Sequence, residues 1–249
     1  MYLSVIIPTY NEEKRIGDSL TKIYSFLEKR DYDFEIIVID DGSNDNTLNL
    51  LTKFSKKVSK IIILKNDTNR GKGYSVKRGI LKSKGDAILF TDADLSTPIE
   101  ETDKLIGWIK NGYQIAIGSR DLPDSQIEKH QVWYREFMGR AFNKIIRIIL
   151  DLDYHDTQCG FKCFKRNAAL EIFNSLKLCG FSFDVEILFI AKQHGIKVKE
   201  VPVRWYNSPE SKVKIIRDSS RMLWDILNIR FNSNSLPQRS PHGSTSTKK

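Results

Sequence analysis

The stretch FEIIVIDDGSNDNT, residues 34–47, sets an almost unbroken apolar run before a cluster of acidic and small residues. Runs that lack the polar alternation of a half-exposed strand are typical of strands buried on both faces of a sheet. Asp40-Asp41-Gly42 ends the run with turn-forming residues, and residues 47–54 then show helical spacing. A buried strand followed by a polar turn and a helix is the repeating unit of a parallel α/β sheet.

The same unit recurs through the first half of the chain. Short apolar runs predict further strands, and apolar residues three to four positions apart predict the helices between them. The predicted strands cover residues 3–8, 61–64, 87–90 and 114–118, and the predicted helices cover residues 12–27, 73–83 and 99–110. We therefore expect an α/β protein with a mostly parallel, Rossmann-like sheet that is flanked by helices.

After about residue 120 the pattern changes. The predicted elements there are a polar loop (121–131), a long helix with basic residues (132–150), a loop (156–162), two helices (167–175 and 184–194), a strand (198–203) and a final helix (211–231). We expect one domain over residues 1–232. Its first half, about residues 1–120, is a nucleotide-type unit, and its second half, residues 121–232, is a more helical acceptor lobe packed on it.

The composition limits the possible functions but does not select one of them. A net charge of +9 over 249 residues suits a phosphate-bearing ligand, an anionic membrane or a nucleic acid. No apolar run approaches the roughly 20 residues of a membrane span, so we expect a soluble body without a secretory signal. Residues 233–249 are polar and rich in Pro, Ser and Thr, and we expect them to form a disordered tail.

The segment FTDADLSTP, residues 90–98, places Asp92 and Asp94 one residue apart at the end of a predicted strand. Two carboxylates that close repel each other, so ionising both requires a cation or hydrogen-bond donors between them. Hard oxygen ligands at such a point suit Mg²⁺ or Mn²⁺. The alternative is a turn in which an aspartate caps the next helix, and Pro98 in a first helical turn fits that interpretation.

Polar segments follow four of the predicted strands. They are Pro8–Asn11, Asp40–Ser43, Asn69–Lys72 and Asp92–Asp94. Ligands of open parallel sheets bind at the carboxyl ends of the strands, so we expect these segments to meet on one rim. Four polar strand ends on one rim are hard to explain as turns alone, which favours the metal interpretation of Asp92 and Asp94.

Several motifs together resemble one known family. SVIIPTYNEE (4–13), IIVIDDGSNDNT (36–47), NRGKGYSVKRG (69–79) and TDADLSTP (91–98) look like a family-2 glycosyltransferase with the GT-A fold. IGSRD (117–121), DTQCGFK (156–162) and VPVRWYNSPESKV (201–213) look like its polyprenyl-phosphate branch. DTQCGFK in particular is similar to dolichyl-phosphate glucosyltransferases. The ordered set, over about residues 2–230, carries the resemblance.

This resemblance implies a donor site on the rim. Asp92 and Asp94 would hold Mg²⁺ or Mn²⁺ against the diphosphate of a nucleotide sugar, with Ala93 between them and Ser96 as a weaker, water-mediated partner. The implied base and ribose site consists of Pro8, Tyr10, Glu12, Ile39 and Asp41. In it, Asp41 would accept a hydrogen bond from the base, while Asp40 braces the loop. The alternatives are core packing for Tyr10 and a simple Asp-Gly turn for the two aspartates.

Basic residues are implied to bind phosphates. Lys72 and Arg120 lie in predicted loops, and Arg120 is favoured because it directly follows a strand. Arg135, Arg204 and Lys212 would bind the acceptor phosphate or the diphosphate, although each alone could equally be a solvated surface charge.

Asp156 opens the DTQCGFK motif and is the usual suggestion for a catalytic base in such enzymes. We discount that role, because a phosphate monoester, with a second pKa of about 6, is already ionised near pH 7. Alignment and charge stabilisation of the leaving group would then carry the chemistry. We expect Asp156 to position the acceptor lobe or the sugar instead.

The resemblance implies an inverting, metal-dependent transfer of glucose from UDP-glucose to dolichyl phosphate. The alternatives are the same reaction with GDP-mannose, a bacterial-type transferase for undecaprenyl phosphate or a glycan hydroxyl, and a non-catalytic nucleotide-sugar binder. A nucleic-acid partner is not expected, since no motif interleaves aromatic and basic residues.

The acceptor's lipid tail implies contact with a membrane. We expect a peripheral protein on the cytoplasmic face of a membrane, the endoplasmic reticulum in a eukaryote, with a membrane-anchoring subunit as an open possibility. The helices at 132–150 and 211–231 mix apolar and basic residues. Either one could therefore lie in the membrane interface, or pack its apolar stripe on the core.

Overall fold

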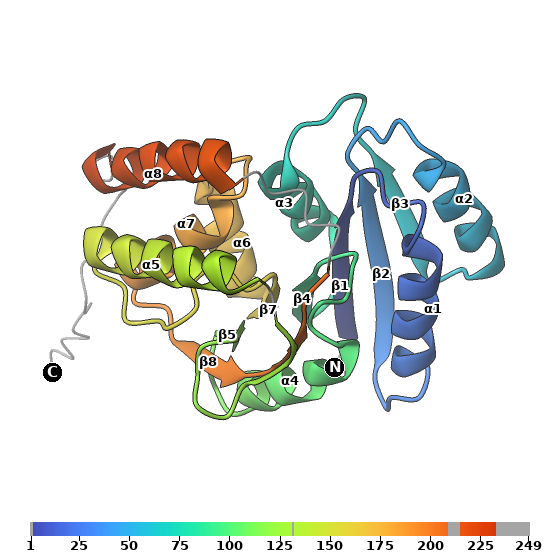
Figure 1. Cartoon of the computed structure of the whole chain (residues 1–249). Helices are drawn as coiled ribbons and strands as arrows, with labels where there is room; N and C mark the ends of the chain where they lie inside the picture. The colour runs from blue at the N-terminus through green and yellow to red at the C-terminus, as the bar shows by residue number, and fades with distance from the viewer. Residues whose placement is uncertain (1, 131, 209–214, 233–249) are drawn as a thin grey trace, which may run out of the picture.

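The computed structural model describes residues 2–130, 132–208 and 215–232 (Figure 1). Within them, one seven-stranded sheet has the order β3-β2-β1-β4-β7-β5-β8. Its strands are β1 (Tyr2–Thr9), β2 (Asp33–Asp40), β3 (Ile61–Lys65), β4 (Ala87–Thr91), β5 (Ile115–Ser119), β7 (Phe161–Lys165) and β8 (Val198–Pro202). All neighbours pair in parallel except β7, which runs antiparallel to both β4 and β5. The predicted α/β class with a mostly parallel sheet is confirmed.

Helices cover both faces of this sheet. One face packs on α1 (Ile16–Leu27), α2 (Thr47–Lys57) and α4 (Thr102–Lys110), which a short 3-10 turn, η1 (Ile99–Glu101), precedes. The other face packs on α3 (Lys72–Lys82), α5 (Trp133–Leu150), α6 (Arg166–Ser175), α7 (Phe183–Gln193) and α8 (Ile215–Asn232). In Figure 1, α5 and α8 lie side by side at the outer edge of the second half.

Burial on both faces explains the apolar runs. Successive side chains of a strand point to opposite faces, so Val5 and Ile7 enter one core while Ile6 enters the other. The same alternation separates Ile36 from Ile37 on β2. A central strand therefore needs apolar residues at nearly every position, which is the pattern that identified these strands.

Three sequence predictions were wrong in detail. The predicted loop at 156–162 ends in β7, and the predicted loop at 121–131 contains β6 (Gln126–Lys129), which pairs with β9 (Arg204–Tyr206) in a two-stranded sheet. The first helix begins at Ile16 rather than at residue 12. The Glu12 carbonyl accepts from the Arg15 and Ile16 amides in a turn, while the Glu12 N–H donates to the Thr47 Oγ1 at 2.7 Å.

Other expectations concern the end of the chain and the membrane. The tail at 233–249 and Lys212 lie outside the described residues. None of the helices that the structure describes is long and apolar enough to cross a membrane.

A substitution of Phe164 tests whether β7 is buried between β4 and β5. Its ring is fully buried and packs edge-to-face on Phe173 of α6, with the ring centroids 5.6 Å apart. Phe164→Ala should lower the free energy of unfolding by about 3–5 kcal/mol, the usual loss for a buried aromatic ring. Urea unfolding measures this, with Leu81→Ala on the exposed side of α3 as the control. A loss below about 1 kcal/mol would contradict burial of β7 between β4 and β5.

Candidate functional site

The predicted rim exists at the carboxyl ends of β3, β2, β1 and β4, which are neighbours in the sheet. Thr9 at the end of β1 lies opposite Asp40 at the end of β2, and Asp40 lies opposite Lys65 on β3. The loops that follow are joined by hydrogen bonds, for example from the Asn11 N–H to the Ser43 Oγ at 2.9 Å. Parallel order thus brings together segments that are far apart in the sequence.

Asp41 holds the loop after β3. Its Oδ1 accepts from the Asn66 Nδ2 at 2.6 Å and from the Arg70 N–H at 2.9 Å, and its Oδ2 accepts from the Gly71 N–H at 2.9 Å. Asp41 thus braces this loop, and Asp40, expected to brace its own loop, accepts from the Asn66 N–H through its backbone carbonyl at 2.8 Å. Asp40 is fully buried, and within the described residues only the Oδ2 of its carboxylate has a donor, the Ser43 N–H at 3.4 Å. Base binding by Asp41 stays a prediction.

The remaining residues of the predicted base and ribose site lie around these loops. Pro8 of β1 lies opposite the buried Ile39 of β2, whose carbonyl accepts from the Thr9 Oγ1. Tyr10 follows β1 and is half-buried. Glu12 is almost fully buried and pairs with Arg15. The structure brings these side chains to the same edge, and their contacts with a nucleotide stay predictions.

Asp92 and Asp94 follow β4 directly and have different neighbours. The Asp92 Oδ1 lies 2.7 Å from the Lys72 Nζ, at the start of α3. Burial raises the pKa of Asp92, although Lys72 opposes that shift. Burial alone would lower the pKa of Lys72, but the carboxylates around it, Asp92 first, raise it, so the ammonium stays charged. The Asp94 Oδ1 accepts from the Ser96 N–H at 3.0 Å, and its Oδ2 lies 3.9 Å from Arg15.

This donor set fits a hard divalent cation. Mg²⁺ is usually held by one or two carboxylates together with substrate phosphates and water. Asp92 and Asp94 provide such a pair, and the described part of the chain holds no cluster of three or more His, Cys, Asp or Glu residues suited to a metal. The helix-cap alternative finds no support, because the residue before η1 is Pro98 and no side chain caps the turn. Ala93 is buried between the two aspartates, and Ser96 stays a predicted partner.

Arg120 and Asp156 form a paired unit beside this rim. The Arg120 Nε lies 2.6 Å from the Asp156 Oδ2, and its Nη2 lies 2.9 Å from the Oδ1, which is a bidentate ion pair. The guanidinium also lies over the ring of Trp205, 5.5 Å from its centroid. Burial would raise the pKa of Asp156, but Arg120 more than offsets this and holds it below the ordinary value. Asp156 is therefore a poor proton acceptor near neutral pH.

The other predicted basic residues are less closely grouped. The Arg204 Nε donates to the buried Glu101 Oε1 at 2.7 Å, so this side chain already has an anionic partner. Arg135 lies in α5, and Lys212 falls outside the described residues. Phosphate binding by Lys72, Arg120, Arg135, Arg204 and Lys212 stays a prediction.

Sequence reasoning missed two features of this site. Arg15 pairs with Glu12 and donates to the Ser208 Oγ at 2.7 Å, so it joins the first rim loop to the segment after β9. The Tyr206 N–H donates to the Ser96 carbonyl at 2.8 Å, which ties the end of β9 to the loop that contains Asp92 and Asp94. The RWY sequence of β9 has the aromatic residues favoured in strands, a signal for the strand although not for its partner.

Comparison with known proteins identifies the family. Residues 4–173 match the model of "Glycosyl transferase family 2". The chain belongs to this family. It is therefore a glycosyltransferase.

Several curated relatives are named dolichyl-phosphate beta-glucosyltransferase. A dolichyl-phosphate beta-glucosyltransferase of Dictyostelium discoideum is 38% identical over 243 residues, which cover 93% of this chain and 74% of that protein. The human protein of the same name is 35% identical, with 92% and 75% covered, and the one from Saccharomyces cerevisiae is 37% identical, with 93% and 75% covered.

Solved structures share the fold. Glucosyl-3-phosphoglycerate synthase from Mycobacterium tuberculosis in complex with UDP is 20% identical, with a TM-score of 0.69 over 93% of this chain and 80% of that one. The same enzyme with Mn²⁺, UDP and glucosyl-3-phosphoglycerate has a TM-score of 0.68 at 19% identity, over 92% and 79%. The expected GT-A fold is confirmed, and identities this low carry no more than the fold.

Asp92→Asn should reduce turnover by about 10²–10³-fold, the usual effect of deleting one electrostatic contact to developing charge. The melting temperature should stay close to that of the wild type, because the amide keeps the shape of the side chain. Initial rates with Mg²⁺ or Mn²⁺ and thermal unfolding measure the two effects. Asp103→Asn is the control, since that half-exposed carboxylate pairs with Arg30 away from the rim. Near wild-type rates in Asp92→Asn would contradict the assignment of this site.

Proposed function

We propose that this protein is an inverting glycosyltransferase that moves glucose from UDP-glucose to dolichyl phosphate, giving dolichyl β-D-glucosyl phosphate and UDP. The observation that carries the proposal is the likeness, over more than nine-tenths of the chain, to proteins named dolichyl-phosphate beta-glucosyltransferase. The described rim supports it, because acidic and basic side chains suited to a nucleotide diphosphate gather at the carboxyl edge of the sheet.

The proposed chemistry needs little proton transfer. An oxygen of the acceptor phosphate attacks the anomeric carbon of glucose, and the bond from that carbon to the UDP oxygen breaks with its electrons on UDP. The attacking oxygen has no proton to lose near pH 7. The protein's part is then to align the two substrates and to stabilise the charge that builds on the leaving diphosphate.

Asp92 and Asp94 would hold Mg²⁺ or Mn²⁺, which when bound neutralises charge on the diphosphate. Lys72 lies beside Asp92 with a raised pKa, so it offers a permanent positive charge at the same point. Arg120 keeps its planar donor fork oriented by Asp156, a geometry suited to a phosphate that approaches its open side.

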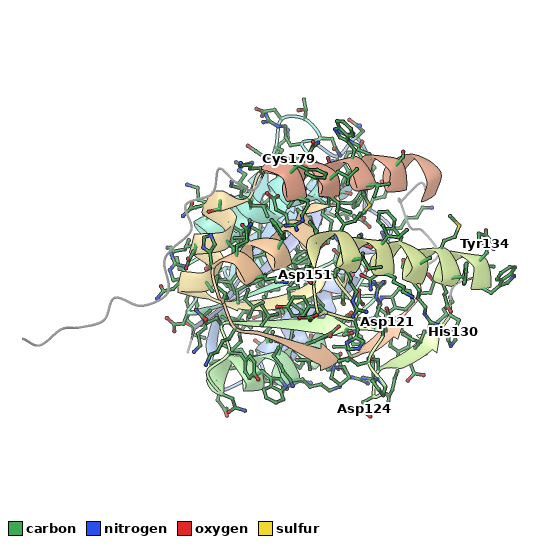
Figure 2. All side chains as sticks on the ribbon, turned by 90° about the vertical axis from the view of Figure 1, so that its left-hand side faces the viewer. Asp121, Asp124, His130, Tyr134, Asp151 and Cys179 are labelled. Carbon is green, nitrogen blue, oxygen red and sulfur yellow. The ribbon has the colours of Figure 1, made fainter. Side chains whose placement is uncertain are left out.

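The outer face of α5 and α8 supports membrane association. Large apolar side chains are exposed along both helices, among them Trp133, Phe137, Ile148, Trp224 and Phe231. Figure 2 views this face, with both helices running across it and Tyr134 at one end of α5. Arg140, Lys144 and Arg221 on the same helices are exposed as well. Apolar side chains with basic flanks are the composition of helices that lie in a membrane interface, so we propose peripheral binding there.

An assay of donor and acceptor tests the function. Labelled UDP-glucose and GDP-mannose are each incubated with dolichyl phosphate or with dolichol, and the lipid products are separated. We expect transfer from UDP-glucose to dolichyl phosphate only. Transfer from GDP-mannose at an equal or higher rate would overturn the choice of sugar, and comparable transfer to dolichol would overturn the choice of acceptor group.

Asp156→Asn tests the absence of a general base. If the acceptor phosphate attacks unaided, this variant should slow the reaction less than Asp92→Asn and keep the shape of the pH profile. Rates between about pH 5.5 and 8.5 at saturating donor and metal measure it, because removing a true base costs about 10²–10⁴-fold and deletes its titration. Loss of a titration that the wild type shows would make Asp156 the base.

The stability of the same variant reports on the ion pair. The native pKa of Asp156 is depressed, so its contribution is complete above the unfolded value of about 3.9 and is lost as the pH falls through the native value. Unfolding of the wild type should therefore lose stability below about pH 4 that Asp156→Asn does not lose. Parallel curves for the two proteins would contradict the pairing.

Membrane association is tested on vesicles. Phe137→Ser combined with Trp224→Ser should weaken binding to vesicles that contain polyprenyl phosphate by more than tenfold, since each large apolar side chain gains up to about 1.5–3 kcal/mol on burial. Transfer to a short, soluble acceptor phosphate should not change. Leu81→Ser is the matched control, because this exposed leucine lies on α3. Unchanged vesicle binding would contradict the proposed face.

A further inference from the structure

A lysine that the proposed chemistry does not use lies buried in the middle of the sheet. Lys162 of β7 has no exposed surface, and its Nζ lies 2.5 Å from the Asp184 Oδ1 and 2.6 Å from the Cys159 carbonyl oxygen. A buried ammonium is costly unless it is both paired and hydrogen-bonded, and these two contacts meet both conditions. An apolar residue would fill the same strand position without the cost of burying a charge.

The carbonyl that Lys162 holds leads directly to the rim. Cys159 precedes Gly160, and a Cβ added to Gly160 would overlap the Asp92 carboxylate. The backbone of Gly160 is thus in contact with the proposed metal ligand. β7 continues from this point along β4, with Phe161 opposite Thr91 and Lys162 opposite Phe90. The Lys162 ammonium therefore holds the backbone segment that contacts the Asp92 side chain.

The start of α7 also supports the helix that carries Lys72, the ion-pair partner of Asp92. Glu186, two residues after Asp184, accepts from the backbone N–H groups of residues 177 and 178. The carbonyl of Cys179, in the same loop, accepts from the Tyr74 N–H at 3.2 Å, in the helix that begins with Lys72. Asp184 and Glu186 lie in the first turn of α7 and act on both partners. Asp184 acts through Lys162 on the backbone next to Asp92, and Glu186 holds the loop that contacts α3.

We propose that Lys162 is a positioning residue for the donor site. By neutralising Asp184 and holding the Cys159 carbonyl, its ammonium keeps Gly160 against Asp92 and so presets that carboxylate for the metal and the donor diphosphate. The proposal rests on the proposed function for the identity of the ligand, although the contacts themselves do not depend on it. Groups that orient a ligating residue typically change metal affinity or activity by about 10–100-fold when they are removed.

Three variants, compared with a control, separate positioning from stability alone. Lys162→Met alone leaves Asp184 buried without its partner and should lower the melting temperature strongly. Lys162→Met/Asp184→Leu removes both charges at similar volume, and such replacements often restore stability, yet the Cys159 carbonyl still lacks its donor. Gly160→Ala keeps the ion pair and displaces Asp92 directly. Lys192→Met is the control, since this exposed lysine forms a surface ion pair with Asp151, just past the end of α5.

Two readouts besides turnover are used. Binding of Mn²⁺ in the presence of UDP is followed by electron paramagnetic resonance, and hydrogen exchange is measured over residues 156–162. In the double variant we expect a recovered melting temperature, Mn²⁺–UDP binding weakened by about 10–100-fold, and faster exchange at residues 159–161. In Gly160→Ala we expect the same weakening of binding. The Lys192→Met control should match the wild type in every measurement.

The outcomes decide between the proposals. Wild-type binding in Gly160→Ala overturns the positioning role, whether or not the double variant is stable. Wild-type binding and exchange in a stable double variant overturn it too, because Lys162 would then act only through stability. Failure of the proposed function is distinguishable from both, since it appears as absent transfer by the wild type, while faster exchange at residues 159–161 in the double variant still supports the positioning role.

Discussion

The antiparallel pairing of β7 with β4 is the contact on which the site depends. It inserts a strand of the second half into the sheet of the first half, between β4 and β5. The chain that enters β7 passes Asp156 and Gly160, so the same insertion carries the Arg120 pair and the Gly160 contact to the end of β4. If the second half only packed on the edge of the sheet, β7 would not bring Asp156 to the end of β4, where Asp92 lies.

The sequence predicted the parts of the fold that depend on local pattern. Strands β1, β2 and β4 are buried on both faces, so their apolar runs were unmistakable, and their order made the meeting of the four strand ends predictable. β7 was missed because FKCFK carries Lys162 at a core position, which a local pattern reads as a polar loop. The partner Asp184, twenty-two residues away, and the Cys159 carbonyl together make a charge acceptable there, and a local pattern does not reveal the first of them.

The candidate site was predictable to the level of segments, and less so to the level of individual side chains. Asp40 and Asp41 are chemically identical neighbours, and the sequence does not say which one turns toward the loop after β3. The strand decides it, because Asp40 still belongs to β2 and is buried with the sheet, whereas Asp41 lies just past the end of the strand and meets Asn66 and Gly71. Pairing partners such as Glu101 for Arg204 also depend on packing that no spacing reveals.

Three of the predicted phosphate-binding cations, Lys72, Arg120 and Arg204, each form an ion pair with a carboxylate. Lys72 pairs with Asp92, Arg120 with Asp156, and Arg204 with Glu101. A long cationic side chain without a partner would lose rotamer freedom each time a phosphate bound, whereas a paired one has already lost it on folding. The pairing also limits the positive charge that the rim gathers, so the fold is not destabilised by repulsion among cations. Carboxylates that seem to compete with an anionic substrate are therefore what keeps its binding groups oriented and charged.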